Sequence, residues 1–169
     1  SLVGSEMCIR DRRRNMDLNI LMFNNRIYGL TKGQYSPTSE VGKVTKSTPM
    51  GSLDEHFNAL TLALGAGATF MARTFDKESM HMQEMITESY HHKGTSFLEI
   101  YQNCNIFNDG AFSSFTDRDT KSDTVLWIKD GEPMVFGADS DKGIRLDGNI
   151  PTVVELGDKW SKDDLLVHN

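Results

Sequence analysis

Apolar and polar stretches alternate along the first two thirds of the chain at spacings that predict strands and helices in turn. Short apolar runs of strand length occur at Leu18–Phe23, Ala68–Arg73 and Ser96–Tyr101, and each is followed by a polar loop. Segments with helical periodicity separate them. Strands that alternate with helices favour a parallel sheet with crossover helices. The sequence therefore predicts an α/β fold, with Leu18–Phe23 as a buried strand of its sheet.

Capping signals and apolar faces predict the two helices. Ser52 has the position of an N-cap, with Glu55 as its capping-box partner, and Gly65 and Gly67 should end this helix. Its apolar residues at helical spacing are Leu53, Phe57, Leu60 and Leu64. A second helix is predicted over Met80 to His92. One face of it carries Met82, Met85, Ile86 and Tyr90, and methionines at this spacing indicate core rather than a metal site.

The loops after these strands should share one edge of the sheet. Parallel strands all point the same way, so their carboxyl ends lie together, and ligands bind in the crevice outside those ends. We therefore expect the loop that starts at Asn24, the loop near Lys77 and the turn that carries Cys104 to face one another across one cleft.

The pattern changes after Asn105. Short apolar pieces at residues 124–128, 133–136, 143–146 and 152–156 alternate with turns rich in Asp, Gly and Lys. This pattern predicts a small, irregular, strand-containing C-terminal extension with a hairpin around Asp130 and Gly131. We place the sheet domain at residues 13–103 and the extension at residues 104–169.

Composition excludes several classes of partner. The chain has 18 Lys and Arg against 24 Asp and Glu, a net charge of −6 at pH 7, which argues against nucleic acid and anionic membrane surfaces. The longest apolar stretch, Ala59–Ala72, is interrupted by polar residues and is shorter than the roughly 20 residues of a spanning helix. Two cysteines do not make a disulfide framework. The expected location is the cytoplasm.

The loop after the first predicted strand carries the most specific motif. Residues 24–38 have the sequence NNRIYGLTKGQYSPT. This stretch resembles the second half of the thiamine diphosphate motif and, more narrowly, the β subunit of 2-oxoacid:ferredoxin oxidoreductases, the 2-oxoglutarate type in particular. The resemblance implies that the side chain of Asn25 and the main-chain carbonyl of Ile27 bind the Mg²⁺ that bridges the cofactor's diphosphate. Oxygen ligands of this kind suit magnesium. An ordinary turn is the alternative if the dipeptides are taken alone.

The same resemblance implies roles for the rest of this loop. Cofactor contacts are implied for Asn24, Tyr28, Gly29 and Leu30, and catalytic roles for Thr31, Lys32 and Gln34. A fixed cation at Lys32 has a physical rationale, because 2-oxoglutarate is a dianion that must lose its water on binding. A solvated loop lysine is the alternative. Thr31 either supports the loop or touches the cofactor.

Cys104 is the second candidate site. A single cysteine after a strand is more often a small buried apolar residue. In the family that the loop resembles, however, a cysteine in this place is the fourth ligand of a 4Fe-4S cluster, and CNIFNDGAF at residues 104–112 resembles the start of its C-terminal extension. A cluster needs four thiolates, so this chain alone could not hold one. Three histidines, His56, His81 and His168, lack neighbours at ligand spacing and are predicted to be structural or exposed.

The resemblance also implies a reaction: oxidative decarboxylation of 2-oxoglutarate, with electrons passed to ferredoxin and the acyl group to coenzyme A, in an enzyme with an α subunit. Residues 1–12 resemble a translated adapter sequence, and the GDGD half of the cofactor motif would lie upstream, so we expect an inactive fragment. The alternatives are a non-catalytic subunit-contact or nucleotide-binding piece, a pyruvate-type oxidoreductase and an acetolactate-synthase-like enzyme. Upstream sequence with GDGD and Cys-x-x-Cys would exclude the non-catalytic piece. An acetolactate-synthase-like enzyme would lack the cysteine, and the choice of 2-oxoglutarate over pyruvate rests on the closeness of the loop match.

Overall fold

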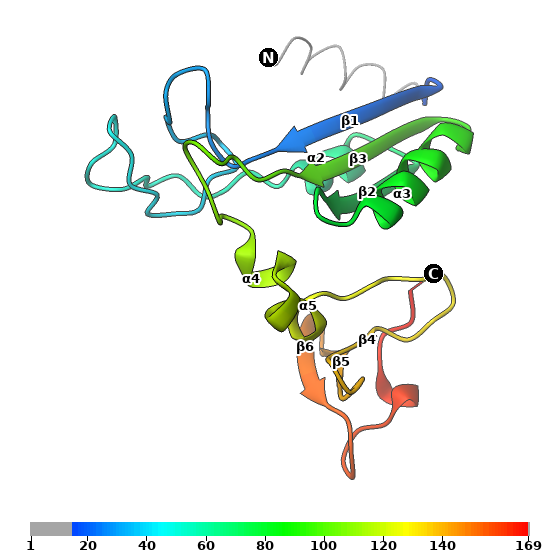
Figure 1. Ribbon diagram of the computed structural model, residues 1–169. Coiled ribbons are helices and arrows are strands. Elements are labelled where there is room, and N and C mark those ends of the chain that lie inside the picture. The colour runs from blue at the N-terminus through cyan, green and yellow to red at the C-terminus, as the bar shows by residue number, and fades with distance from the viewer. Residues whose placement is uncertain (1–14, 169) are drawn as a thin grey trace. The chain divides into compact units, whose positions relative to one another are not determined.

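The computed structural model describes residues 15–168 and divides into two compact units, the first ending at Ala111 and the second beginning at Phe112 (Figure 1). The predicted foreign leader at residues 1–12 lies outside the described residues. Among residues 15–168, no helix is both long enough and apolar enough to cross a membrane.

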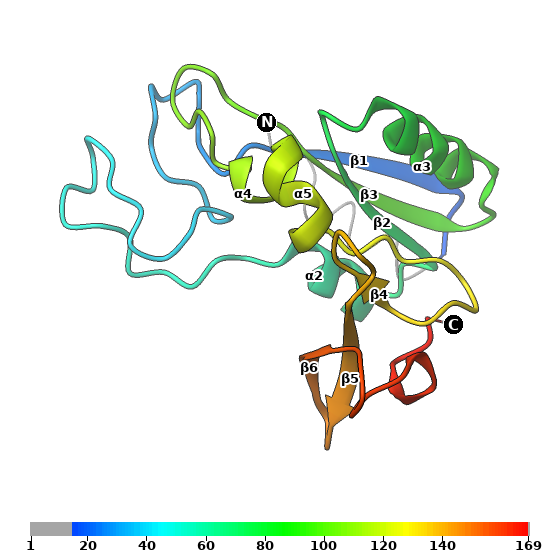
Figure 2. The same ribbon diagram turned by 60° about the horizontal axis from the view of Figure 1, so that its bottom comes forward.

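Within the described residues, the first unit is a parallel sheet with one helix on each face. Its strands β1 (Leu18–Asn24), β2 (Phe70–Phe75) and β3 (Thr95–Tyr101) have the order β1-β3-β2 and pair in parallel. Helix α2 (Ala59–Gly65) packs on one face, and α3 (Ser79–His91) packs on the other (Figures 1 and 2). The predicted α/β fold with crossover helices is confirmed.

The buried strand is β3 and not β1, which corrects the prediction for Leu18–Phe23. Strand β3 lies between β1 and β2, and all residues of β3 are buried except for the half-buried Tyr101. On β1, Leu21 and Phe23 are 44% and 60% exposed. They lie on the sheet face that α3 covers, but α3 packs over β2 and β3 and leaves this part of β1 open within the described residues.

The core beneath α2 combines three alanines with larger apolar side chains. Ala59, Ala63, Ala68 and Phe97 are buried together, and the half-buried Ile20, Met22 and Leu60 pack against them. The helix begins at Ala59, later than predicted, because Asn58 is the N-cap and its side chain accepts a hydrogen bond from the Thr61 amide at 3.1 Å. Ser52 instead is a buried loop residue, and Leu53 is almost fully exposed.

The inner face of α3 differs in part from the predicted one. Met82 and Met85 are half-buried, as expected of core methionines. Tyr90, however, is 71% exposed, because the helix turns Ser89 toward the sheet, where its hydroxyl lies 2.8 Å from that of Ser96. The contact between the last turns of α3 and strand β3 is therefore polar.

The second unit combines short helices with an antiparallel sheet. The helices are α4 (Ser113–Thr116), α5 (Arg118–Thr124) and the 3₁₀ helix η1 (Lys162–Asp164), and the strands β4 (Val135–Phe136), β5 (Lys142–Asp147) and β6 (Ile150–Glu155) pair in that order. The strand-containing extension is confirmed. Helices α4 and α5 were not predicted, because they are too short and polar to show periodicity, and residues 124–128, one of the short apolar pieces, contain no β-strand.

The hairpin of this unit lies elsewhere than predicted. It joins β5 to β6 through Gly148, whose φ of +62° is easily adopted by glycine. The turn at Asp130 and Gly131 does not join two paired strands. Its flanks pair instead with the chain end, where the Gly131 amide donates to the His168 carbonyl at 2.7 Å.

Candidate functional site

The carboxyl ends of the strands meet at one edge, as predicted. Asn24 ends β1 directly opposite Tyr101 of β3. The Gln102 amide donates to the Asn24 carbonyl at 3.0 Å, and the Asn103 amide donates to Oδ2 of Asp76, after β2, at 2.8 Å. The loops after all three strands are therefore tied together at this edge, and the motif loop and the turn before Cys104 both begin there.

Two asparagine side chains bend the chain as it leaves β1. Oδ1 of Asn24 accepts from the Arg26 amide at 3.0 Å, and Oδ1 of Asn25 accepts from the Ile27 amide at 3.2 Å. Arg26 has a backbone φ of +54°. Residues other than glycine rarely adopt this left-handed conformation, and it is often found at functional sites. The polar pair NN is thus a pair of side-chain-stabilised turns, and Ile27 is buried at its end.

These residues fit a magnesium site. Asn25 is half-buried, and the Ile27 carbonyl accepts no hydrogen bond from the described residues, so it has both lone pairs available. A carboxamide oxygen and a main-chain carbonyl two residues apart are hard oxygen ligands of the kind that magnesium shares with phosphate and water. Together they would supply part of a magnesium coordination sphere.

The tip of the loop is a closed turn that carries the predicted catalytic residues. The Tyr28 amide donates to the Gln34 carbonyl at 2.8 Å, and the Gly33 amide donates back to the Tyr28 carbonyl at 3.0 Å. Between them lie Leu30, which is fully exposed, and Lys32, which has φ of +62°. The side chains of Leu30 and Lys32 are therefore exposed at the tip of the loop.

Thr31 and Gly29 contribute to the turn itself. The Thr31 hydroxyl donates to the Tyr28 carbonyl at 3.2 Å, and the Gly29 carbonyl accepts from the Lys32 amide at 3.0 Å. Gly33 lies against Phe107, so close that an added Cβ would come within 3.1 Å of the ring. Thr31 thus supports the loop in this structure.

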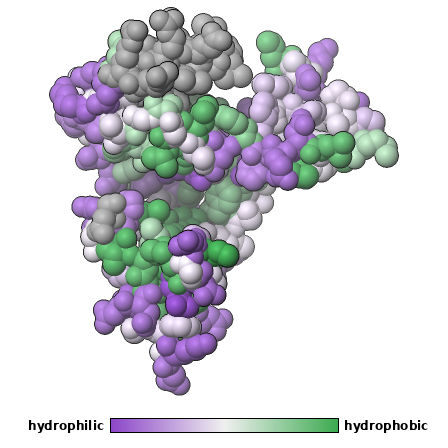
Figure 3. Space-filling view, turned by 180° about the vertical axis from the view of Figure 1, so that it is seen from behind, coloured by the Kyte–Doolittle hydropathy of each residue, from purple (hydrophilic) through white to green (hydrophobic). Residues whose placement is uncertain are grey.

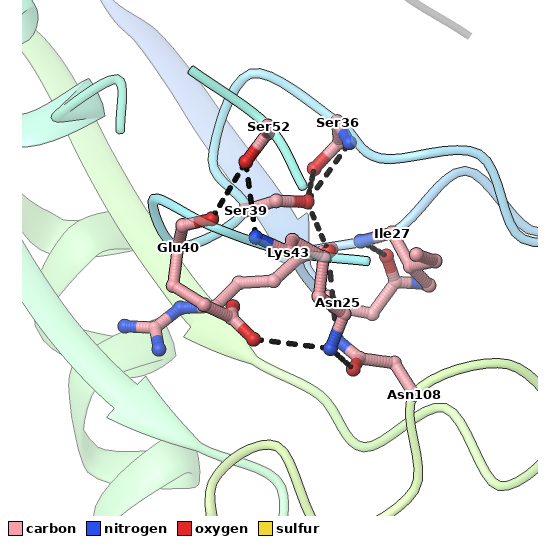
Figure 4. A network of polar contacts seen from close by, with 9 residues as sticks. Asn25, Ile27, Ser36, Ser39, Glu40, Lys43, Ser52 and Asn108 are labelled. Carbon is pink, nitrogen blue, oxygen red and sulfur yellow. Dashed lines mark hydrogen bonds and ion pairs between the residues drawn. The ribbon is translucent and has the colours of Figure 1, made fainter. Parts of the chain in front are cut away.

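A polar network beneath the loop contains residues that the sequence did not single out (Figure 4). Nδ2 of the buried Asn108 donates to the carbonyl of Asn25 at 3.0 Å, and Oδ1 of Asn108 accepts from Nζ of Lys43. The Ser39 hydroxyl donates to the Arg26 carbonyl at 2.6 Å. The backbone around Asn25 is therefore held from two sides, by the loop that follows it and by the turn after β3.

Lys43 is also paired with Glu40, 3.0 Å away. Partial burial raises the pKa of the Glu40 carboxyl, but hydrogen bonds from its own backbone amide and from Lys43, with the charges of Lys43 and Arg26, outweigh burial and hold this pKa below its ordinary value. Lys43 is consequently fixed between a carboxylate and Asn108 and can orient the latter.

Cys104 lies on the same turn as Asn108. It is a free, half-buried thiol, and its carbonyl accepts from the Asn108 amide at 3.0 Å. Cys104 can supply one thiolate. Within residues 15–168, no group of three or more His, Cys, Asp and Glu side chains could hold a metal ion.

The three histidines that the sequence assigned to structural or exposed roles are distributed over both units. His56 and His168 are exposed. His81 is half-buried on α3, with Nδ1 3.0 Å from the Thr74 hydroxyl.

Comparisons with known proteins point to one family. A sequence model of the thiamine pyrophosphate enzymes, C-terminal TPP binding domain, matches residues 8–100. The chain is 47% identical over 167 residues to the 2-oxoglutarate oxidoreductase subunit KorB of Mycobacterium tuberculosis, covering 99% of this chain and 44% of that protein. It is 39% identical over 106 residues to the 2-oxoacid:ferredoxin oxidoreductase subunit beta of Saccharolobus solfataricus, covering 63% and 35%.

A solved structure supports the same grouping. The 2-oxoglutarate:ferredoxin oxidoreductase of Magnetococcus marinus, solved with 2-oxoglutarate, coenzyme A and succinyl-CoA bound, aligns with a TM-score of 0.61 and 33% identity, over 64% of this chain and 37% of that one. The chain spans less than half the length of these relatives. Two of the sequence matches extend into residues 1–12, and the foreign origin of that segment stays a prediction.

The fold, the loop and the comparisons agree. The family model covers 93 of the 169 residues, including the whole parallel sheet except its last residue and the loop with Asn24 and Asn25. The chain therefore belongs to the thiamine pyrophosphate enzymes and is, among them, a relative of the β subunits of 2-oxoacid:ferredoxin oxidoreductases.

Proposed function

We propose that this chain is part of the β subunit of a cytoplasmic 2-oxoacid:ferredoxin oxidoreductase that converts 2-oxoglutarate to succinyl-CoA and passes the electrons to ferredoxin. The observation that carries this proposal is the loop at residues 24–38, which leaves a parallel strand at its carboxyl end and offers oxygen ligands there. The identity of 47% to a 2-oxoglutarate oxidoreductase subunit supports this choice of substrate.

The loop would hold thiamine diphosphate and Mg²⁺. Asn25 through its carboxamide oxygen and Ile27 through its carbonyl would bind the metal, and Asn24, Tyr28, Gly29 and Leu30 would line the cofactor. When bound, thiamine diphosphate supplies the carbon nucleophile and the electron sink that a 2-oxoacid needs to lose carbon dioxide. The contribution of this chain is a backbone that is already bent and hydrogen-bonded before the cofactor arrives, which lowers the cost of binding.

The loop tip would recognise the substrate. Lys32 is exposed, and its left-handed backbone projects it from a closed turn, so a carboxylate can approach it from solvent. 2-Oxoglutarate has a second carboxylate that pyruvate lacks, and a cation at the binding site offsets the cost of removing water from it. Gln34 would hydrogen-bond at the same place, while Thr31 keeps the turn closed.

Cys104 would supply one thiolate to a 4Fe-4S cluster. Its turn is joined to the cofactor loop through Asn108, so a cluster held there would lie on the edge of the sheet where the cofactor binds. The remaining cluster ligands, the rest of the magnesium site and an α subunit would come from outside this chain. Ferredoxin, 2-oxoacid and coenzyme A would be the other partners, with no role for nucleic acid or membrane.

Substrate choice tests this proposal. In the complete subunit assembled with its partners, coenzyme A-dependent reduction of ferredoxin should be faster with 2-oxoglutarate than with pyruvate. Lys32→Met should lower kcat/KM for 2-oxoglutarate by roughly 10- to 100-fold, the loss of a charged hydrogen bond, and should lower it much less for pyruvate. Lys46→Met, an exposed lysine in the following loop, is the control.

Two results would contradict the proposal. Reduction with pyruvate but not with 2-oxoglutarate would indicate a pyruvate-type enzyme. Equal losses for both substrates in Lys32→Met would remove the substrate role of Lys32 and leave it a role in the cofactor site or the loop.

A further inference from the structure

A buried carboxylate lies beneath the start of the cofactor loop. Glu99 occupies the central strand β3 and is 2% exposed. It lies opposite Met22 on β1 and Arg73 on β2, on the face of the sheet that α2 covers. A buried charge is costly unless it is paired and hydrogen-bonded, so its neighbours must account for it.

Arg73 and Asn24 each bind one oxygen of this carboxylate. Nε and Nη2 of Arg73 each lie 2.8 Å from Oε2, and Nδ2 of Asn24 donates to Oε1 at 2.8 Å. The guanidinium supplies the opposite charge and lies over the ring of Tyr101, 5.0 Å from its centroid. Each oxygen of Glu99 therefore has its own partner, and one of these partners is the first residue of the NN pair.

The carboxylate dictates how the Asn24 side chain is oriented. An ionised carboxylate only accepts hydrogen bonds, so it admits only the NH₂ end of the carboxamide. Oδ1 must then point away from Glu99, where it accepts from the Arg26 amide at 3.0 Å and from the Thr38 hydroxyl at 2.7 Å. These two bonds hold Arg26 in its left-handed conformation and tie the loop to its own later part.

We propose that Glu99, with Arg73 as its counter-ion, is a positioning residue for the cofactor loop. By fixing Asn24 it sets the direction in which the chain leaves β1, and with it the placement of the Asn25 and Ile27 oxygens. This inference rests on the cofactor binding proposed above for the same loop.

Hydrogen-bond logic predicts the effect of an isosteric change. In Glu99→Gln, the amide oxygen must face Arg73, which only donates, so the NH₂ group faces Asn24. Asn24 must then turn its carboxamide to offer Oδ1 to Gln and NH₂ to the Arg26 amide. The NH₂ group of Asn24 and the Arg26 amide, both donors, then face each other. The hydrogen bond from the Arg26 amide to Asn24 is lost, although the volume of the side chain at position 99 is almost unchanged.

The test compares Glu99→Gln with Ser96→Ala in the complete subunit assembled with its partners. Ser96 is also fully buried on β3, but at the amino end, where its hydroxyl donates to Oδ1 of Asn19 at 2.6 Å. Its loss weakens the same strand far from the loop. The measurements are the melting temperature without cofactor, and the Kd for thiamine diphosphate at limiting and at saturating Mg²⁺.

Glu99→Gln should raise the Kd about 10-fold at limiting Mg²⁺, the lower end of what losing the outer support of a metal site costs, and less at saturating Mg²⁺. Ser96→Ala should lower the melting temperature and leave the Kd unchanged. An unchanged Kd in Glu99→Gln would overturn the inference, and so would an equal rise in Ser96→Ala.

Two further variants keep the test decisive. If Glu99→Gln does not fold, Arg73→Lys takes its place. Lysine keeps the charge but cannot direct two nitrogens at Oε2 of Glu99, so Arg73→Lys should also raise the Kd. An unchanged Kd in Arg73→Lys would overturn the inference. Asn25→Ala separates the two proposals. A weaker Kd in Asn25→Ala with no effect of Glu99→Gln overturns this inference alone, whereas an unchanged Kd in Asn25→Ala overturns the proposed cofactor site and this inference with it.

Discussion

Removal of the Asn108 side chain should loosen the cofactor loop while the sheet stays intact. Asn108 is 5% exposed and donates to the carbonyls of Asn25 at 3.0 Å and Arg26 at 3.4 Å. The shorter bond is worth about 1 kcal/mol, the longer one less, and the bond from the charged Lys43 about 1.5 kcal/mol or more. Because Lys43 keeps Glu40 as a partner at 3.0 Å, we expect Asn108→Ala to cost about 2 kcal/mol of local stability.

Amide hydrogen exchange, measured by mass spectrometry on the complete subunit, reports this local stability. A loss of about 2 kcal/mol corresponds to roughly 30-fold faster exchange in peptides with the Arg26 and Ile27 amides, while peptides from β3 should not change. Asn105→Ala is the matched control, because Asn105 is exposed on the same turn and accepts a hydrogen bond from Asn103 at 2.6 Å, away from the Asn25 backbone. Parent-like exchange in Asn108→Ala, or the same acceleration in Asn105→Ala, would refute the reasoning.

Two other predictions concern single side chains of the first unit. Cys104→Ser in the complete subunit should lower the iron content of the enzyme or shift the cluster potential and leave thiamine diphosphate binding intact; unchanged spectra and ferredoxin reduction would return Cys104 to a packing role. Burial lowers the pKa of His81 below its ordinary value, against a smaller opposing effect of Glu84 and Glu78. His81 therefore binds a proton more tightly in the unfolded chain than in the folded one. The stability that neutral His81 contributes should be lost as the pH falls from about 6.5 through the lower pKa of His81 in the folded protein. His81→Gln should remove this part of the pH dependence of the melting temperature, and identical pH profiles for both proteins would contradict it.

The sequence predicted the sheet because its signals are local. Apolar runs of strand length that alternate with helical segments require parallel strands, and from this the shared edge of Asn24 and Cys104 followed. Burial could not be predicted in the same way, because it depends on strand order. Leu98 and Phe23 lie in similar apolar runs, yet β3 is central and β1 is at the edge, so only Leu98 is buried.

Errors in the helices have a similar cause. Ser52 and Glu55 satisfy the capping-box pattern, but the Ser52 hydroxyl donates to the Glu40 carbonyl at 3.0 Å and accepts from the Lys43 amide at 3.1 Å. A tertiary contact thus uses the side chain that local preference would place at a helix end. Asn58 has equal capping ability and is free of such a contact, so the helix starts after it.

The candidate site divides into a part that the sequence shows and a part that it does not. The NN pair and the residues up to Gln34 form one contiguous motif, so a resemblance could identify them. Glu99 and Arg73 lie 75 and 49 residues after Asn24, and Asn108 lies 83 residues after Asn25. The pairing of β3 with both β1 and β2, and the turn after β3, bring them to the loop, and no spacing in the sequence indicates this.

The most direct test of the central claim is the affinity of the assembled enzyme for thiamine diphosphate in the presence of Mg²⁺, measured by titration calorimetry on the parent and on Asn25→Ala. Asn149→Ala, in the exposed turn between β5 and β6, is the control. The account predicts tight binding by the parent and by the control. Asn25→Ala should bind about 1.5–3 kcal/mol more weakly, because an oxygen that interacts with a charged group is lost. Parent-like affinity in Asn25→Ala would contradict the assignment of this loop as the cofactor site.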